Sequence, residues 1–212
     1  MIHEILPVGM LQCNCSIMGD ETTREAIVVD PGDDIEAIQA ILQRHGLRLT
    51  SIVITHAHID HIGGAKKLKD LTGAPLYLNE LDMDLYRIMD EQASFLGTPP
   101  PQTANVDVFL REGEEVRCGE IRASVIHTPG HSPGSVCLLV PDGKETKLIA
   151  GDTLFRESIG RTDLWGGNSR NILMSLKEKL LPLEDNIVVV PGHGPLTTIG
   201  HEREYNPFLQ AF

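Results

Sequence analysis

The sequence predicts an α/β protein in which two packed sheets are covered by helices on their outer faces. Short, branched apolar runs that are typical of strands alternate with segments of helical periodicity along the 212 residues. Some strands are bounded by turns and others by helices, which indicates two groups of strands with helices around them. Four strands end in a His or Asp beside a glycine, and we expect these ends to converge on one edge of the sandwich.

The first half of the chain alternates strands and helices. Strands are expected over residues 2–6, 11–18, 26–30, 49–55 and 75–79, and helices over 34–45, 64–71 and 80–95. Asp33 or Asp34 is a suitable N-cap for the helix over 34–45, and Gly46 ends it. The helix over 80–95 carries an apolar face and is expected to serve mostly in packing.

The second half contains more strands than helices. Two or three short strands are expected within 105–127, the last over Ile121–His127, then strands over 135–140, 146–151 and 187–190, and helices over 169–180 and 199–206. Pro141-Asp142-Gly143-Lys144 is a turn signal, and Asn168 can cap the helix over 169–180. The length suits one domain spanning residues 1–212.

Composition limits the classes of partner and the compartment. A formal net charge of −12 argues against nucleic acid and against an anionic membrane surface. No run reaches the roughly 18 apolar residues of a membrane span, and the N-terminus alternates like a strand instead of forming a signal peptide, so a cytoplasmic location is expected. The cysteines lack paired C-x-x-C spacing, and we expect buried thiols at Cys13, Cys15, Cys118 and Cys137.

The stretch from Ile54 to Gly64 places three histidines and an aspartate within six residues, directly after a predicted buried strand. Neutral imidazole and carboxylate are ligand types that zinc and iron prefer. His56 and His58 lie two apart and can chelate one ion, whereas Asp60 and His61 follow on the turn and can face a second.

Three later strands end in the same way, with His131, Asp152 and His193 beside glycines. Together with the first stretch they supply five imidazoles and two carboxylates, which suits two transition-metal ions. His127 is the alternative to His131 in its loop. Asp30, at the end of the strand over 26–30, is either a turn residue or a carboxylate that orients a ligand histidine.

The H-x-H-x-D-H stretch, Gly151–Phe155, Gly160–Leu164, Pro191–Pro195 and Asn206–Leu209 together resemble the metallo-β-lactamase superfamily, and most closely its short, single-domain glyoxalase II-like (hydroxyacylglutathione hydrolase-like) branch. The resemblance implies an αββα sandwich of two mixed sheets with helices on the outer faces. It also implies the ligand sets: His56, His58 and His131 for one ion, Asp60, His61 and His193 for the other, and Asp152 between them.

The implied activity is hydrolysis of a thioester such as S-lactoylglutathione by a hydroxide that bridges two divalent ions, with zinc the first choice and iron or manganese as alternatives. Asp60 and Asp152 would be catalytic because they position the ions and the nucleophile, and Asp30 matches a position that orients a ligand. True β-lactamases of the superfamily usually have cysteine where this chain has Asp152, and they are secreted.

The substrate contacts stay open. Full-length glyoxalase II enzymes add a C-terminal helical domain with basic residues for glutathione, whereas this sequence ends at Phe212. Arg161 and Arg156 are candidate anchors for a substrate carboxylate, or else surface residues paired with Asp163 or Glu157. Trp165 either lines the pocket or packs in the core.

Other functions remain as alternatives. A persulfide dioxygenase is a relative that uses one iron held by two His and one Asp, and the Gly160–Asp163 run resembles that family too. A lactonase and a non-catalytic, metal-stabilised binding module are further possibilities, whereas a nuclease is disfavoured by the acidic charge. A small-molecule partner is expected, and the oligomeric state is left open by the sequence.

Overall fold

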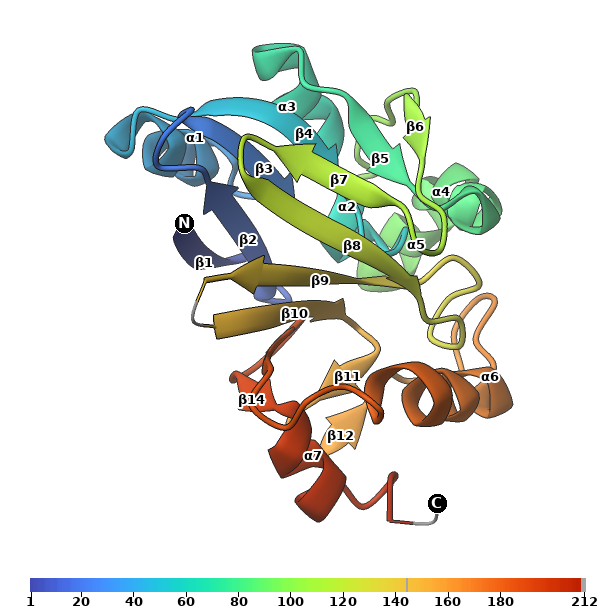
Figure 1. The fold of residues 1–212 in the computed structure, drawn as a ribbon. Helices are drawn as coiled ribbons and strands as arrows, with labels where there is room; N and C mark the ends of the chain where they lie inside the picture. Colours follow the sequence, from blue (N-terminus) through green and yellow to red (C-terminus); the bar gives the residue numbers. More distant parts are fainter. Residues whose placement is uncertain (144, 211–212) are drawn as a thin grey trace.

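Two six-stranded sheets packed face to face form the centre of the molecule, seen in a computed structural model that describes residues 1–143 and 145–210 (Figure 1). In the first sheet the strands follow chain order: β1 (Ile2–Val8), β2 (Cys13–Gly19), β3 (Glu25–Val29), β4 (Arg48–Val53), β5 (Leu76–Leu78) and β6 (Val108–Phe109). Pairing is antiparallel from β1 to β3 and parallel from β3 to β6, so this sheet is mixed.

The second sheet has the order β14-β13-β10-β9-β8-β7 and is also mixed, because β10 and β13 pair in parallel. Its strands are β7 (Glu115–Cys118), β8 (Ile121–His127), β9 (Val136–Asp142), β10 (Glu145–Gly151), β13 (Val188–Pro191) and β14 (Thr197–Thr198). A small hairpin of β11 (Leu154–Phe155) and β12 (Ser158–Ile159) lies beside it.

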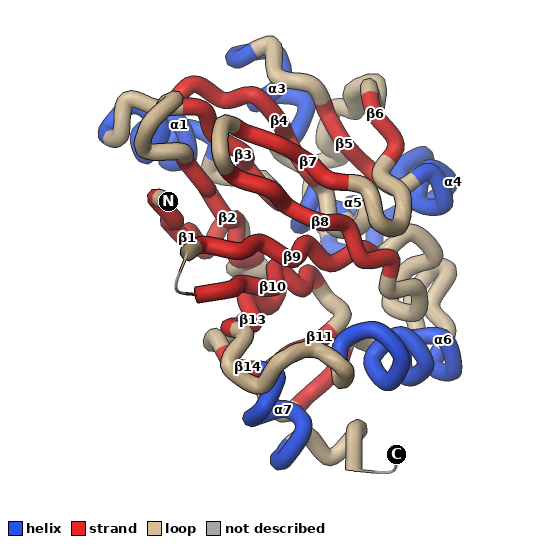
Figure 2. Tube along the Cα trace, in the orientation of Figure 1, coloured by secondary structure: helices blue, strands red, loops and turns tan. Residues whose placement is uncertain are grey.

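Helices cover the two outer faces, as the blue segments of Figure 2 show. On the first sheet lie α1 (Ile35–Arg44), α2 (Ile59–Ile62), α3 (Ala65–Thr72), the 3₁₀ turn η1 (Glu80–Asp82), α4 (Met83–Arg87) and α5 (Met89–Leu96). On the second lie α6 (Ser169–Ser175), the π-helical turn η2 (Leu176–Leu180) and α7 (Ile199–Tyr205). None of the helices in the described ranges has the length and apolar composition of a membrane-spanning segment.

Three apolar layers hold this arrangement together, and alternation along single strands produces them. In β3, Ala26 and Val28 face the helices, whereas Ile27 and Val29 face the other sheet. In β13, Val189 faces the second group of helices and Val190 faces the first sheet. Side chains on neighbouring strand positions point to opposite faces, so central strands such as β3 and β13 are buried on both sides. The predicted αββα sandwich is therefore confirmed.

Strand register brings distant residues to one edge. Val29 pairs with Val53, so Asp30 lies next to the segment that follows β4. Gly151 pairs with Pro191, so the chain after β10 and the chain after β13 leave the second sheet side by side. Both pairings are parallel, and the carboxyl ends of parallel neighbours meet at the same edge.

Some local predictions were wrong. The helix predicted over 80–95 is divided into η1, α4 and α5. Asp82, at φ −94° and ψ 3°, separates η1 from α4, and Ile88, at φ −99° and ψ 31°, separates α4 from α5. Asp34 precedes α1 but does not cap it: its backbone is left-handed, and its carboxylate accepts a hydrogen bond from Gly9 N instead. The segments α2, β11, β12 and β14 were not predicted. Lys144 of the predicted turn lies outside the described residues.

Candidate metal centre

The structure brings all seven predicted ligands to one edge of the sandwich. The first sheet supplies four of them from the segment after β4, and the second sheet supplies three from the ends of β8, β10 and β13; in chain order they are His56, His58, Asp60, His61, His131, Asp152 and His193. The predicted buried strand before the H-x-H-x-D-H stretch is β4, whose residues Ile52 and Val53 are fully buried. The rigid strand therefore fixes where the ligand segment begins.

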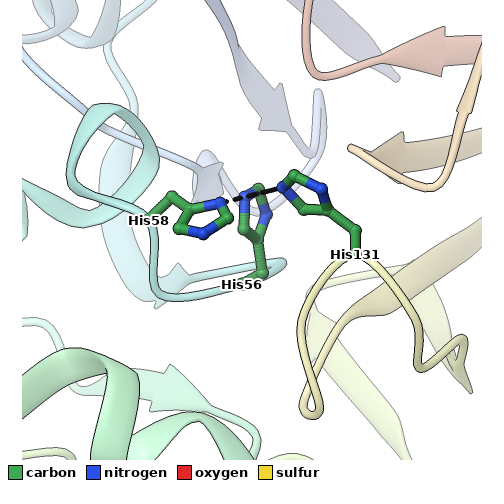
Figure 3. Close-up of side chains that lie close together, drawn as sticks. All are labelled: His56, His58 and His131. Carbon is green, nitrogen blue, oxygen red and sulfur yellow. Dashed lines mark hydrogen bonds between the residues drawn. The ribbon is translucent and has the colours of Figure 1, made fainter. Parts of the chain in front are cut away.

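The first group of ligands consists of His56, His58 and His131, which point toward one another from two loops (Figure 3). The Nδ1 atom of His58 lies 2.8 Å from Nε2 of His131, and Nε2 of His131 lies 3.2 Å from Nε2 of His56. All three side chains are buried. One small cation can be held by three nitrogens so arranged.

The second group consists of Asp60, His61 and His193. The Nε2 atom of His193 lies 3.1 Å from Oδ2 of Asp60 and 3.2 Å from Nε2 of His61. Asp60 and His61 stand on α2, so a short helical turn replaces the irregular loop that the sequence predicted there.

Asp152 lies between the two groups and faces both. Its Oδ2 atom lies 3.4 Å from Nε2 of His131, and its Oδ1 atom lies 3.4 Å from Nε2 of His61. The carboxylate of Asp152 lies so close to the backbone of Gly192 that only glycine fits there, because an added Cβ atom would lie 2.1 Å from Asp152 Oδ1. A carboxylate with one oxygen toward each group has the geometry of a bridging ligand.

Hydrogen bonds on the outer side of the rings fix the tautomers of four histidines. The Nδ1 atoms of His131 and His193 lie 2.8 Å and 3.0 Å from the carbonyl oxygens of Arg161 and Leu11. A carbonyl oxygen only accepts, so each Nδ1 must carry a proton, and Nε2 is the ring nitrogen left to face the site.

The same argument applies to His56 and His61. The hydroxyl of Thr55 donates to Asp30, so it accepts from Nδ1 of His56 at 3.1 Å. His61 donates from Nδ1 to Oδ2 of Asp30 at 2.9 Å. The Nε2 atoms of His56, His61, His131 and His193 are thus directed inward, which is the arrangement of metal-ligating histidines.

Electrostatics and unsatisfied atoms also fit a cation. Burial, together with the neighbouring imidazoles, holds the pKa of His56 well below its ordinary value and that of His58 at about 3, so both rings are neutral. Among the described residues, no side chain or backbone group hydrogen-bonds the buried Nε2 of His58 or Oδ1 of Asp152. A cation bound here would satisfy these buried atoms and the ring nitrogens that face one another at about 3 Å, so the residues present fit bound metal ions.

Asp30 is buried beneath the second group, with 2% of its surface exposed. It accepts hydrogen bonds from the backbone N–H and the hydroxyl of Thr55 at 2.7 Å and 2.6 Å, in addition to the one from His61. Of the two roles that the sequence left open, this geometry is that of a carboxylate that orients a ligand histidine.

Two buried polar residues at the site were missed by the sequence reading, which assigned the segment 80–95 mostly to packing. Asp82 accepts from the backbone N–H of Ala57, and also from Ser132 Oγ at 2.8 Å and Gly134 N at 2.5 Å. Gln92 accepts from Ile59 N at 2.9 Å and donates to the carbonyls of Ala57 and Leu85. Both therefore hold the backbone of the ligand segments. The only sequence signal was two polar residues on an otherwise apolar helical face.

A cavity of about 350 Å³ opens onto the two groups, and Arg161 and Trp165 line it. The guanidinium of Arg161 forms a two-pronged ion pair with Asp163, at 2.7 Å and 2.8 Å. Trp165 packs edge-on against Phe95, with ring centroids 5.6 Å apart, and also packs against the core. Trp165 therefore both lines the cavity and packs against the core.

Arg156 does not line this cavity, and the structure contradicts its prediction as a substrate anchor. It lies in the turn between β11 and β12, which carries it to a separate groove with Thr198 and His201. Its nearest carboxylate is Glu157, at 3.9 Å.

The remaining histidine and cysteine predictions concern structural roles. His127 Nε2 donates to the carbonyl oxygen of Pro133 at 2.9 Å and does not belong to either ligand group. The four cysteines all fall in the described part of the chain, where they are buried and unpaired. Burial raises the pKa of Cys13 to about 11, so this thiol, 3.4 Å from Nδ1 of His61, stays protonated.

Comparison with known proteins agrees with this centre. The family model of the metallo-beta-lactamase superfamily matches residues 8–193. Among curated proteins, the chain is similar to the protein named hydroxyacylglutathione hydrolase GloC from Haemophilus influenzae, with 37% identity over 215 residues that cover 98% of each chain.

Two solved structures are also similar over nearly their whole length. BLEG-1, described as a B3 metallo-beta-lactamase, superposes with a TM-score of 0.90 at 40% identity and covers 99% of this chain and 100% of its own. TTHA1623, solved in a di-iron-bound form, gives a TM-score of 0.84 at 39% identity, covering 97% and 100%. These matches cover both ligand groups.

Proposed function

The chain belongs to the metallo-beta-lactamase superfamily, and from that premise we propose that it is a metal-dependent hydrolase of the glyoxalase II type, which cleaves a thioester such as S-lactoylglutathione. The name of the Haemophilus influenzae relative supports this substrate class. The chemistry of a thioester supports it too. The leaving thiolate has a conjugate pKa of only ~8.5, so its departure does not need a strong general acid.

The observation that carries the proposal is the position of Asp152. One carboxylate oxygen faces the first histidine group and the other faces the second, each at 3.4 Å from an imidazole nitrogen. Six ligand residues arranged around a shared carboxylate exceed what a single ion needs. We therefore propose two divalent ions, with zinc the first choice and iron or manganese as alternatives, since imidazole and carboxylate suit all three.

When bound, such ions supply an activated water at neutral pH and polarise the carbonyl of the substrate. The protein residues provide the rest. Asp60 would be a ligand of the second ion, and Asp152 would be a ligand shared by both. Asp30 and the carbonyls of Arg161 and Leu11 keep the imidazoles in their ligand tautomers, and apolar side chains line the rest of the cavity.

Two other activities are candidates. Similarity to BLEG-1 at 40% identity favours hydrolysis of a β-lactam as a second activity of the same centre. A mononuclear iron dioxygenase needs only one ligand group, and it leaves the cluster of Asp60, His61 and His193 without a role, so we place it below the hydrolase. A lactonase or a metal-stabilised binding module ranks lower still.

The test combines elemental analysis with assays on one purified sample. We expect close to two ions per chain together with hydrolysis of S-lactoylglutathione. One iron per chain with oxygen uptake on glutathione persulfide, and no thioester turnover, would establish the dioxygenase instead. Hydrolysis of a chromogenic cephalosporin in the absence of thioester turnover would establish the β-lactamase.

A matched pair of variants ties the activity to the second group. His193→Ala should reduce the metal content by about one ion and the turnover by at least 100-fold. His201→Ala is the control, because His201 lies on α7 and bonds to Glu157 away from the centre. Equal activity of both variants would contradict a binuclear mechanism.

A further inference from the structure

The polar residues that line the cavity are already engaged. Five of the seven belong to the ligand groups: His58, Asp60, His131, Asp152 and His193. A sixth, Gln92, is 2% exposed and uses both amide N–H groups on backbone carbonyls. The seventh, Arg161, is the one cation among the described lining residues, and Asp163 engages its guanidinium through two hydrogen bonds. Few hydrogen-bonding groups of the cavity lining are therefore free to bind a charged group of a substrate.

The rest of the lining is apolar. Ile59, Leu96 and Leu164 are half-buried, and the edge-on pair of Phe95 and Trp165 forms one wall. Large apolar side chains at the mouth are exposed as well, with Phe95 at 64%. Exposed aromatic surface at the rim of a cavity with a catalytic centre marks a site for an apolar ligand.

The apolar surface continues beyond the metal centre. A second cavity of about 370 Å³ shares four lining residues with the first: Leu11, Ile59, Asp60 and Leu96. Its other lining residues include Met10, which is 68% exposed, and the ring of Pro99. Lys67 lies there too, but it is paired with Glu36. The two cavities are therefore adjacent, the first of them contains the ligand groups, and we call the pair the groove.

We propose that this groove binds an apolar arm of the substrate, so that the preferred thioesters carry an extended alkyl or aryl group on one side of the scissile bond. The inference rests on the proposed function, because it assigns the class of thioester. The charged ends of a glutathionyl group gain little here, since Arg161 and Lys67 already have carboxylate partners.

Binding can be measured without turnover because Trp165 is the only tryptophan of the chain and lines the cavity. The probes are S-methyl, S-butyl and S-hexyl thioethers of N-acetylcysteamine, titrated into the metal-loaded protein while its fluorescence is followed. A groove that half-buries each methylene should tighten binding about twofold per methylene, or roughly 30-fold from methyl to hexyl. The S-hexyl thioether of glutathione should bind within about threefold of its neutral counterpart.

Phe95→Ala tests the wall, and Phe208→Ala is the control because Phe208 is also exposed but does not line either cavity. Phe95→Ala should weaken binding of the hexyl compound about fivefold and of the methyl compound less than twofold. Phe208→Ala should change neither. Affinity that is independent of alkyl length, or equal losses in both variants, would overturn the inference.

Hydrolysis assays on the same sample separate the two proposals. One series varies the acyl chain at a constant thiol, and the other varies the thiol at a constant acyl group; the series in which kcat/KM rises with length identifies the arm. Turnover of S-lactoylglutathione without length dependence in binding or in either series refutes the apolar arm and leaves the hydrolase. Length-dependent binding without turnover of any thioester supports an apolar ligand in the groove and refutes the thioester hydrolase.

Discussion

The carboxylate of Asp82 accepts a hydrogen bond from the backbone N–H of Ala57 at 2.9 Å, and Ala57 is the residue between His56 and His58. The same carboxylate accepts from Ser132 Oγ, next to His131. A single buried side chain thus joins the two loops whose imidazoles form the first ligand group. The distances within that group depend on a residue that touches none of its rings.

Asp82→Asn should loosen the first group. The amide retains one acceptor oxygen but directs an N–H₂ group at backbone N–H donors, so at least one of the hydrogen bonds to the loops is lost. We expect about 10- to 100-fold weaker metal retention, as is usual when a partner of the ligands is removed. Metal content after dialysis against a graded chelator measures this. Asp84→Asn is the matched control, because Asp84 is two residues away and fully on the surface, with a side chain that is 92% exposed.

Asp30→Asn should affect the second group selectively. An amide at this position can present its N–H₂ to Nδ1 of His61, which favours the tautomer with the proton on Nε2, the atom that faces Asp152. We expect the metal content to fall toward one ion per chain while the fold is retained. Asp33→Asn, three residues along in an exposed position, should keep both ions. Retention of two ions with unchanged affinity in Asp30→Asn would contradict the orienting role.

Gly192→Ala should displace the bridging carboxylate. The added Cβ atom would lie 2.1 Å from Oδ1 of Asp152 and 2.8 Å from Cε1 of His61, so one of these ligands must move. Activity is expected to fall at least tenfold, because positioning errors of about 1 Å have effects of this size. Gly194→Ala is the control for backbone strain without a steric clash. Gly194 has φ +76°, and a Cβ atom added there would have no neighbouring atom within 4 Å. This variant should lose roughly 1 kcal/mol of stability but no activity.

Stability should fall as the pH is lowered below 6.5, partly because of His3. Burial lowers the pKa of His3 from 6.5 to about 4 in the folded protein. The unfolded chain therefore binds a proton between these values while the native protein does not, and the free energy of unfolding decreases as the pH falls through this window. From pH 7.5 to 5 the loss from His3 is roughly 2 kcal/mol.

His3→Gln should remove this part of the pH dependence. Urea unfolding of the wild type and of the variant at both pH values gives the difference, in which the contribution of the ligand histidines cancels. The control is His201→Ala, whose ring lies on α7 beside Glu157. A variant with the same pH dependence as the wild type would show that His3 is not responsible.

The ligand groups could be predicted because each ligand lies in a segment that follows a strand with a clear apolar pattern. Ile52 and Val53 before His56, or Val189 and Val190 before His193, are buried strand residues that the sequence pattern predicted. Parallel pairing of neighbouring strands then brings their ends together. Local pattern and topology pointed to the same site, so the fold and the grouping of ligands followed.

The supporting residues could not be predicted, because their partners are distant in the sequence. Asp82 lies 25 residues from Ala57 and 50 from Ser132, and it stands among acidic neighbours that are exposed. Its place on an otherwise apolar helical face was the only local signal, and that signal does not identify the partners of the carboxylate. Arg156 failed for the opposite reason: its motif is close to the site in sequence, but a two-residue turn directs it elsewhere.

Both ligand groups combine residues from the two sheets. His58 and His131 are 73 residues apart in the chain, and His61 and His193 are 132 apart. An ion held by either group would therefore act as a cross-link between the two halves of the sandwich. By the chain-entropy model for disulfides, closing loops of this length removes roughly 4 to 5 kcal/mol of conformational freedom from the unfolded chain per link. In this fold, the groups that would perform the chemistry would also fasten one sheet to the other.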